Sequence, residues 1–408
     1  MVDELIFLVG WPVTPRDVVR FGLDLLSSEG FKVKVFDLSL LLNAAALRSH
    51  PVADAVEGGY VSRFASYDDL DSKIRRAAPT AAFIDYLKGL DGIDFRTRRV
   101  FRMLKRHSAC YYIVSAGALP LYGVDPSAGV SAYIMNKLRK AADPARLARF
   151  IAKKAIAGLT RYANMYPAPD GIFSSGESEV LERFLNLNRL GMDCVILVHS
   201  LDYDTYLHYM RGLGWKPPEL EKTCVFLDEA LTNHPDFSIL GIRPIGAGPY
   251  FKSMCRLFDA VERQTGLKVV IAAHPRSACE DMQDAYGGRE IIKGKTIDLV
   301  ARASLVVAHT STAVSFAVLF ARPLVLTKTA EMVEKGFSGL VDVMAASLGV
   351  NVVNIDDAAV LARTSFNPDA NMGSRYEEYK YKYIKSRGAG DFTVWEMVAG
   401  YLKGSHVA

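Results

Sequence analysis

The apolar residues of this chain fall into short runs that are separated by amphipathic helical patterns. Continuous runs rich in β-branched residues are typical of strands buried on both faces of a parallel sheet. In the first half, a helical pattern covers residues 15–28, and the alternation of strands and helices predicts an α/β fold with helices covering the sheet. The strands expected in this half are residues 5–9, 33–36, 81–86, 111–114, 171–173 and 194–198.

A second α/β series follows a break from Gly212 to Pro218, where glycine and proline are dense. The break lies near the middle of the 408 residues and predicts a domain boundary, with a cleft between the two halves. The tail, residues 376–402, indicates two helices broken between Gly388 and Gly390. The other helices expected in this half are about 250–264, 297–302 and 312–320, and the strands are 224–227, 269–273, 305–308, 322–326 and 350–353.

Two of these strands end at polar residues suited to an anion. The strand at 269–273 is followed by His274, Pro275 and Arg276, and a histidine or an arginine fork can hold a phosphate. The strand at 305–308 is followed, after one histidine, by Thr310, Ser311 and Thr312, so that hydroxyls and backbone N–H groups meet a helix start. Ligands of open α/β sheets bind at the carboxyl ends of strands, so we expect a phosphate site here. The alternatives are a packing histidine and ordinary helix capping.

A carboxylate pair, Asp228 and Glu229, follows the strand at 224–227. Either carboxylate is a candidate general base for a sugar hydroxyl, with a helix cap or an ion pair as the alternative. Gly246 and Gly248 precede the next helix, where a structural turn is favoured over a phosphate cradle because no GxGxxG or Walker pattern is present.

In the first half, the candidate residues are fewer. Gly10 ends the first strand, where a glycine allows a substrate to approach the backbone and equally serves a tight turn. Glu177 has the same ambiguity as the carboxylate pair. Asp202 and Asp204, close to His199, are a weak candidate for a hard metal, and we expect no metal site.

Composition narrows the class of protein. Half of the residues are hydrophobic and 23% are charged, which is typical of a chain with a large core. The five cysteines are scattered with no CxxC pair, which argues against a disulfide framework or a zinc site and favours a reducing cytoplasm. The sequence shows no signal peptide and no run of about 18 apolar residues, so a cytoplasmic location is expected.

The net charge of +4 is too small to indicate nucleic acid, but the basic residues are unevenly placed. From Lys137 to Arg161 there are eight basic residues and a single acid, Asp143, on a helical pattern. These residues form either a solvated helix face or a peripheral contact with an anionic membrane or a lipid-linked substrate. A second basic helix face lies upstream, formed by Arg96, Arg98, Arg99, Arg102, Lys105 and Arg106.

The strand ending in His-Pro and the later strand ending in Ser/Thr residues, followed by Arg322-Pro323, resemble GT-B glycosyltransferases over residues 224–330. The resemblance is greatest to bacterial capsule and lipopolysaccharide enzymes, including those that use CMP-activated acidic sugars such as sialic acid or Kdo. It implies His274, Ser311 and Thr312 as contacts of the donor phosphate and Asp228 or Glu229 as the base. One departure is Ala230, where the bacterial sialyltransferase pattern has glycine after the acidic pair.

The resemblance also implies a domain plan: two Rossmann-like domains, residues 1–215 on the acceptor side and 216–375 on the donor side. Residues 376–408, which contain Trp395 and Glu396, would form a helical tail that crosses back to the first domain. The implied activity is metal-independent transfer of a sugar from a nucleotide donor to a surface glycan or lipid-linked acceptor, with no cofactor and no nucleic acid. A non-hydrolysing sugar-nucleotide epimerase, which usually has Ser-Gly-Gly after the late strand, and a non-catalytic component of polysaccharide assembly are the alternatives.

Overall fold

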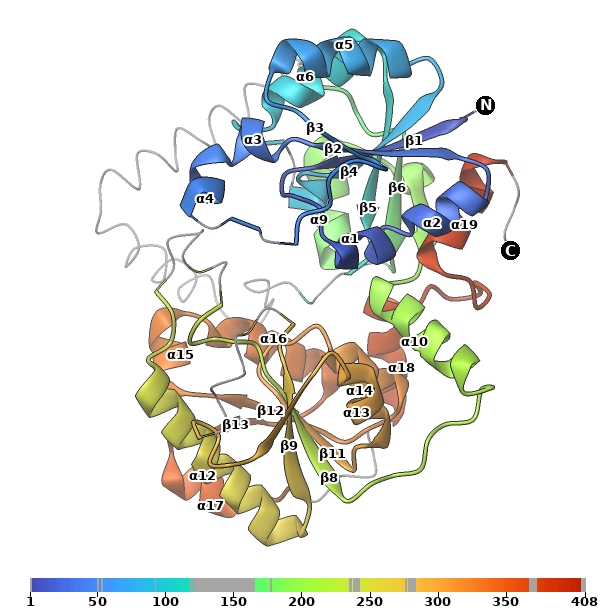
Figure 1. Cartoon of the computed structure of the whole chain (residues 1–408). Helices are drawn as coiled ribbons and strands as arrows, with labels where there is room; N and C mark the ends of the chain where they lie inside the picture. Colours follow the sequence, from blue (N-terminus) through green and yellow to red (C-terminus); the bar gives the residue numbers. More distant parts are fainter. Residues whose placement is uncertain are drawn as a thin grey trace. The chain divides into compact units, whose positions relative to one another are not determined.

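The chain forms two compact units, which we describe from a computed structural model (Figure 1). The described residues before 117, those of 166–201 and those of 388–404 belong to the first unit. The described residues of 202–387 belong to the second unit. The residues that the structure describes are 2–49, 51–52, 54–91, 93–117, 120, 166–176, 178–234, 237, 243–275, 277, 284–366 and 373–404.

The first unit is built on a seven-stranded parallel sheet with the strand order β3-β2-β1-β4-β5-β6-β7. Alternate residues of the central strand face opposite layers: Leu5 and Phe7 pack with α2 and α19, whereas Ile6 and Leu8 pack with α5, α6 and α9. The strands are β1 (Glu4–Val9), β2 (Lys32–Asp37), β3 (Val61–Arg63), β4 (Ala81–Tyr86), β5 (Cys110–Ser115), β6 (Gly171–Ser175) and β7 (Val195–Val198). The helices are α1 (Pro15–Arg20), α2 (Leu23–Ser28), α3 (Ser39–Leu42), α4 (Ala44–Ser49), α5 (Tyr67–Ala77), α6 (Arg98–Arg106), α9 (Glu179–Asn188), α19 (Val394–Leu402) and two 3₁₀ turns (Gly89–Asp91 and Met192–Cys194).

The second unit repeats this plan with a six-stranded parallel sheet in the order β10-β9-β8-β11-β12-β13. The strands are β8 (Thr223–Leu227), β9 (Lys268–Ala273), β10 (Glu290–Lys293), β11 (Leu305–Ala308), β12 (Leu324–Lys328) and β13 (Val352–Asn354). The helices are α10 (Leu201–Gly212), α12 (Ala247–Thr265), α13 (Thr296–Arg302), α14 (Val314–Leu319), α15 (Ala330–Lys335), α16 (Ser338–Leu348), α17 (Ala358–Arg363), α18 (Gly373–Tyr379) and a π-helical turn (Lys380–Ile384). None of the helices in the described residues is long and apolar enough to cross a bilayer.

The predicted α/β class is confirmed, and each predicted strand is present within a few residues. Two strands were missed, β3 and β10, and both lie at an edge of their sheet. Each has at most two consecutive apolar residues, Val61 alone in β3 and Ile291 and Ile292 in β10, which is too short a run to indicate a strand.

The domain boundaries differ from the prediction. The break lies at Leu201–Asp202 rather than at 215–216, because Tyr203, Leu207 and Met210 of α10 pack into the core of the second unit. The glycine- and proline-rich segment after α10 is therefore a connection inside that unit. The tail also divides at Arg387, since Tyr376, Tyr379, Tyr383 and Ile384 belong to the second core.

The last helix, α19, packs on the first unit through Trp395. Its indole Nε1 donates to the carbonyl of Arg20 at 2.8 Å, and its ring centroid lies 5.2 Å from that of Phe7. A Cβ on Gly22 would lie 2.5 Å from this indole, and Gly22 also has a φ of +57°. Glycine is needed there for two reasons, so the predicted single helix at 15–28 breaks into α1 and α2.

The end of α14 contains a non-glycine residue in the left-handed region. Ala321 has a φ of +51°, while the N–H of Ala321 donates to Val318 O and that of Arg322 donates to Ala317 O. This bond pattern is a Schellman motif, in which glycine is preferred at the position of Ala321.

We expect Ala321→Gly to raise the free energy of unfolding by about 0.5–1 kcal/mol, because the left-handed strain of an exposed alanine is removed. The matched control is Gly266→Ala at the end of α12, where φ is +68° and no atom lies within 4 Å of the added Cβ. The free energy of unfolding of that variant should fall by a similar amount. Denaturant titration measures both, and a destabilised Ala321→Gly protein would contradict the assignment.

Candidate functional site

The strand order of the second unit places its switch point at β8. β9 pairs with one side of β8 and β11 with the other, so the chain leaves the sheet in opposite directions from neighbouring strands (Figure 1). Ligands of open α/β sheets bind at the carboxyl ends of strands at such a point. Here these ends carry Asp228 and Glu229 after β8, His274 after β9, and His309 and Thr310 after β11.

Asp228 is buried and connects the end of β8 to neighbouring loops through hydrogen bonds. Its Oδ1 accepts from Ala230 N at 3.1 Å and from the Tyr286 hydroxyl at 3.0 Å, and its Oδ2 accepts from His274 N at 3.4 Å. Both carboxylate oxygens are therefore engaged in holding the loops after β8 and β9. This arrangement gives Asp228 a structural role in the site.

Ala230, which closes this turn, has a φ of +51° and is 1% exposed. A left-handed conformation costs an alanine about 1–2 kcal/mol relative to the right-handed one. The bacterial sialyltransferase pattern that the sequence resembles has glycine here, and the backbone has the conformation that glycine favours. The departure noted in the sequence thus changes the side chain and leaves the turn in place.

Glu229 points to the other neighbour, β11. Its two carboxylate oxygens accept from the backbone N–H and the hydroxyl of Thr310, each at 2.5 Å. Burial raises the pKa of Glu229 to about 7, and the bonds from Thr310 oppose this rise. Glu229 therefore changes charge near neutral pH, which is the range in which a general base works best.

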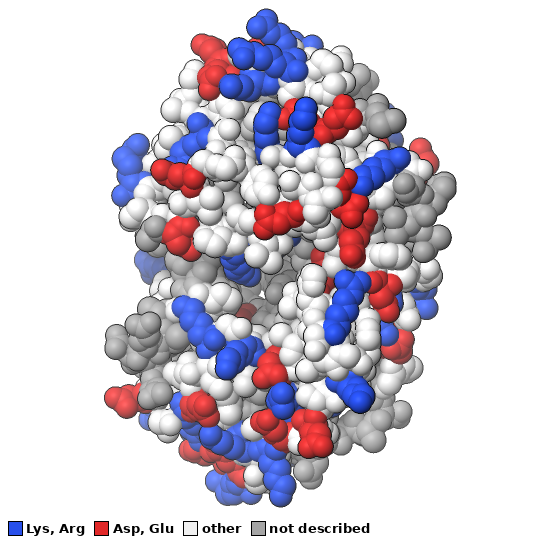
Figure 2. All heavy atoms as spheres, turned by 45° about the vertical axis from the view of Figure 1, so that its right-hand side comes forward, with Lys and Arg blue, Asp and Glu red and all other residues white. Residues whose placement is uncertain are grey.

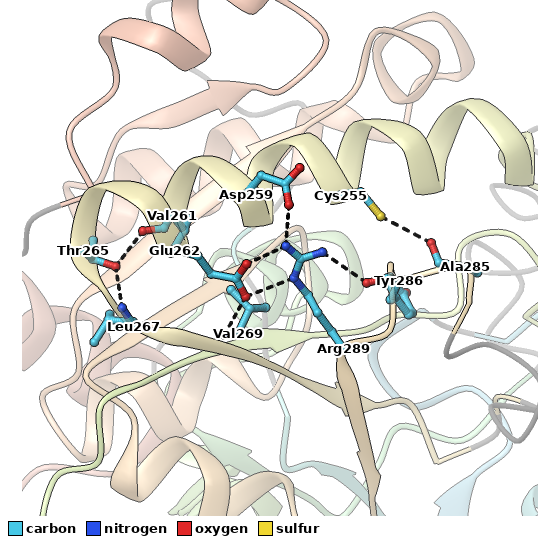
Figure 3. Close-up of polar contacts among 10 residues, drawn as sticks. All are labelled: Cys255, Asp259, Val261, Glu262, Thr265, Leu267, Val269, Ala285, Tyr286 and Arg289. Carbon is cyan, nitrogen blue, oxygen red and sulfur yellow. Dashed lines mark hydrogen bonds and ion pairs between the residues drawn. The ribbon is translucent and has the colours of Figure 1, made fainter.

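An ion network centred on the largely buried side chain of Arg289 holds the loop that carries Tyr286 (Figure 3). Arg289 donates from Nε and Nη2 to Glu262 at 3.1 and 2.6 Å and from Nη2 to Asp259 at 2.6 Å. Its Nη1 donates to the carbonyl of Tyr286 at 3.2 Å. Because Glu262 and Asp259 lie on α12, this network fixes the Tyr286 loop to that helix and so positions the hydroxyl that binds Asp228.

His309 is fully buried and belongs to the core. Its Nδ1 lies 2.7 Å from the carbonyl of Thr327, so this nitrogen carries the hydrogen, and Nε2 accepts from the Tyr250 hydroxyl at 3.0 Å. Burial lowers the pKa of His309 to about 4. The ring is neutral at physiological pH and is not available to a phosphate.

The three residues of the predicted hydroxyl cluster, Thr310, Ser311 and Thr312, differ in how far their donors are already hydrogen-bonded. Both donors of Thr310 are taken by Glu229, so a phosphate would have to displace that carboxylate to use them. Helix α14 begins at Val314 rather than at 312, and Ser311 Oγ accepts from Ala313 N at 3.3 Å. In the described part of the chain, no protein group accepts from the N–H groups of Ser311 and Thr312. These two residues keep the donors that the prediction required.

His274 lies beside a histidine that the sequence did not single out. The ring centroids of His274 and His234 are 4.7 Å apart, with the rings 62° from parallel. His234 follows β8 by seven residues, and its place on the loop after a central strand was the signal that could have identified it. Arg276, the third residue of the predicted group, lies outside the described residues.

The glycines before α12 do not offer a free anion cradle. The N–H of Gly246 donates to both oxygens of Glu331 at 3.0 Å, so a protein carboxylate already takes this position. Lys335 pairs with Glu331 at 2.6 Å and lowers the pKa of that carboxyl. Gly248 lies in the first turn of α12. The structural-turn interpretation fits Gly246. For Gly246 to bind a donor phosphate through its N–H, the Glu331 carboxylate would have to move.

The predicted residues of the first unit are less informative. The carbonyl of Gly10 accepts from Asn43 Nδ2 at 2.8 Å, and an added Cβ would make only ordinary contacts. Glu177 and the basic stretch from Lys137 to Arg161 lie outside the described residues. Among the residues that are described, no three histidine, cysteine, aspartate or glutamate side chains gather as metal ligands, and Asp202 and Asp204 lie on α10.

No known family model matches the chain, and no curated protein matches it in sequence. Solved structures match over nearly the full length at low identity. LpCGTa in complex with UDP has a TM-score of 0.50 and 12% identity, over 98% of this chain and 99% of that one. S. aureus MnaA with UDP (TM-score 0.49, 12% identity, 99% and 96% covered) and Acinetobacter baumannii MurG (TM-score 0.47, 8% identity, 99% and 100% covered) are also similar. The predicted GT-B-like fold is confirmed by this likeness, which at such identity shows the fold alone.

The raised pKa of Glu229 predicts a pH-dependent gain from Glu229→Gln. The unfolded chain releases this proton near pH 4.5 and the folded protein near pH 7, so the contribution to stability is full below 4.5 and is lost as pH rises to 7. Glutamine cannot ionise, so its contribution does not change with pH. Between pH 4.5 and pH 7.5, the difference in unfolding free energy between the variant and the wild type should therefore shift by about 2–3 kcal/mol in favour of the variant.

Denaturant titrations of both proteins across this range measure the gap. The control is Glu331→Gln, because the lowered pKa of Glu331 gives the opposite sign: its contribution is present above pH 4.5 and is lost as pH falls. A gap between Glu229→Gln and the wild type that stays constant with pH would show that Glu229 titrates normally.

Proposed function

We propose that the protein is a nucleotide-sugar-dependent glycosyltransferase whose donor phosphate binds where β8, β9 and β11 end. The observation that carries the proposal is the grouping at this switch point of a titratable carboxylate, a histidine pair and backbone donors that have no acceptor among the described residues. Each has a distinct role in transfer: a base, a partner for the leaving phosphate and an anion cradle. The GT-B-like fold is compatible with this activity.

The donor phosphate is proposed to bind the N–H groups of Ser311 and Thr312, their hydroxyls and the imidazole of His274. Donors aimed at the leaving group stabilise the charge that develops on it in the transition state. The nearby acidic pair is less repulsive than its formal charge suggests, because Asp228 accepts three hydrogen bonds and Glu229 is partly protonated near pH 7.

Glu229 is the proposed base. Its pKa of about 7 suits proton transfer, whereas both oxygens of Asp228 already hold the loops of the site. The acceptor hydroxyl gives its proton to Glu229, its oxygen bonds to the anomeric carbon of the donor sugar, and the bond from that carbon to the nucleotide phosphate breaks. A phosphate that takes the two donors of Thr310 would release Glu229 for this step, which couples donor binding to the base.

The donor we propose is a CMP-activated acidic sugar of the sialic acid or Kdo type, as the strand-end sequences suggest, with a glycan or lipid-linked acceptor. The reaction is proposed to need no metal, because His274 and the backbone donors would bind the phosphate oxygens directly. The basic residues from Lys137 to Arg161 support a peripheral contact with an anionic membrane. LpCGTa was solved with UDP, so the nucleotide base is the first property to measure.

A thermal-shift series with CMP, UDP and GDP should identify the donor base. A nucleotide present at about 100 times its dissociation constant stabilises the folded protein by about 2.7 kcal/mol, and we expect CMP to give the largest shift. A larger shift with UDP or GDP would identify that nucleotide as the donor in place of CMP, and the proposed glycosyltransferase activity would still stand. No shift with any of the three would favour a non-catalytic component of polysaccharide assembly.

His274→Ala and the double variant Ser311→Ala/Thr312→Ala should each lower kcat by about 100-fold or more, because each removes stabilisation of the leaving phosphate. Glu229→Gln should lose activity and also the rise of kcat/KM with pH near 7. The matched control is His208→Ala, an exposed histidine on α10. Product analysis with the donor alone detects an epimerase, since an epimerised nucleotide sugar would form without any acceptor.

A further inference from the structure

A small polar cavity lies between two helices of the first unit. Helices α5 and α6 pack side by side on the sheet, with Leu70 and Ile74 of one and Val100 and Leu104 of the other in a common core. Beside this core the two helices line an open cavity of about 270 Å³. Its lining residues are Asp68, Asp71, Arg99, Arg102, Met103 and Arg106.

Helix geometry brings three guanidinium groups to this cavity. Arg99, Arg102 and Arg106 are spaced by three and four residues, which places them on one face of α6. Two of the three have partners on α5: Arg99 lies 4.0 Å from Asp68, and Arg106 lies 3.3 Å from Asp71. Figure 2 shows Lys and Arg side chains gathered with a few acidic ones at the end where Figure 1 shows α5 and α6.

Arg102, the middle residue, has no such partner. Its Nε is buried and makes no hydrogen bond with any residue that the structure describes, and its guanidinium carbon lies 6.0 Å from the centre of the Tyr166 ring. A buried donor without an acceptor is costly, and a guanidinium is costlier. Among the described residues that line the cavity there are thus three guanidinium groups and two carboxylates, and the Nε of Arg102 has no acceptor.

We propose that this cavity binds a phosphate-class anion, with the Arg102 fork on two of its oxygens and Arg99 and Arg106 at its sides. A planar guanidinium binds two phosphate oxygens at once, and this would satisfy the buried Nε. The space exceeds that of one water, about 30 Å³, several-fold and is sufficient for a phosphate group. The site shares no residue with the proposed donor site.

Two sources offer this group: a soluble phosphate ester and the headgroup of an anionic lipid. They share the chemistry that the cavity recognises and differ in what carries the phosphate. Arg98 provides the matched control, because it lies on the same helix, stacks on Phe95 at 3.7 Å and does not line the cavity.

The test is calorimetric titration of the full-length chain with inorganic phosphate. The affinity should fall about 10- to 100-fold in Arg102→Gln and stay within about twofold in Arg98→Gln, because a hydrogen-bonded charge is removed only in the first. Arg102→Lys keeps the positive charge but loses the two-pronged guanidinium, so its phosphate affinity should lie between those of Arg102→Gln and Arg98→Gln. Because the proposed donor site also binds a phosphate, the titration is repeated in a His274→Ala background, where the phosphate binding that depends on Arg102 should remain.

Co-sedimentation with phosphatidylglycerol vesicles, against phosphatidylcholine vesicles, separates the two sources. Binding to the anionic vesicles that Arg102→Gln and Arg102→Lys weaken, and Arg98→Gln does not, identifies a lipid phosphate. Phosphate binding that depends on Arg102 without vesicle binding identifies a soluble ester. Equal phosphate affinity in the wild type, Arg102→Gln and Arg102→Lys, or no phosphate binding by the wild type, overturns the proposal.

Discussion

The second unit depends on the hydrogen bonds that the acidic pair after β8 makes to both neighbouring strand ends. Parallel strands leave the sheet with backbone N–H groups that need acceptors, and at a switch point the chain diverges, so no regular ladder supplies them. Asp228 accepts from the loop after β9, and Glu229 accepts from the loop after β11. Two consecutive carboxylates thus join the three central strand ends.

This arrangement is energetically costly because it places two acids side by side, Asp228 buried and Glu229 partly buried. The charge of Asp228 is spread over three donors, whereas Glu229 keeps a raised pKa of about 7. Just below, His309 is neutral between Tyr250 and Thr327 and adds no compensating charge. The site is therefore held together by a group whose charge is easily changed, and the same property makes that group suitable for proton transfer.

The first unit differs from the second in its helical layers and in the place of its charged groups. Its two helical layers are separated by the alternation along β1, and one of them includes α19 from the end of the chain, fixed by Trp395 against Gly22. The opposite layer contains the basic face of α6. The two units thus share a strand plan but differ at their functional surfaces, with a carboxylate pair at the strand ends of one and a guanidinium cluster on a helix of the other.

The sequence by itself determined eleven of the strands and the residues that follow the central ones, because buried parallel strands have continuous apolar runs, whereas their order in each sheet came from the structure. It missed β3 and β10, whose apolar runs are too short, and it placed the boundary at a glycine-rich loop although the packing of α10 decides it. Only the tertiary structure decided which donors remain available. Thr310 gives both of its donors to Glu229, Gly246 gives its N–H to Glu331, and His274 lies against His234. These partners are 81, 85 and 40 residues apart in the chain, so their pairing depends on how the strands and loops pack and leaves no local pattern to read.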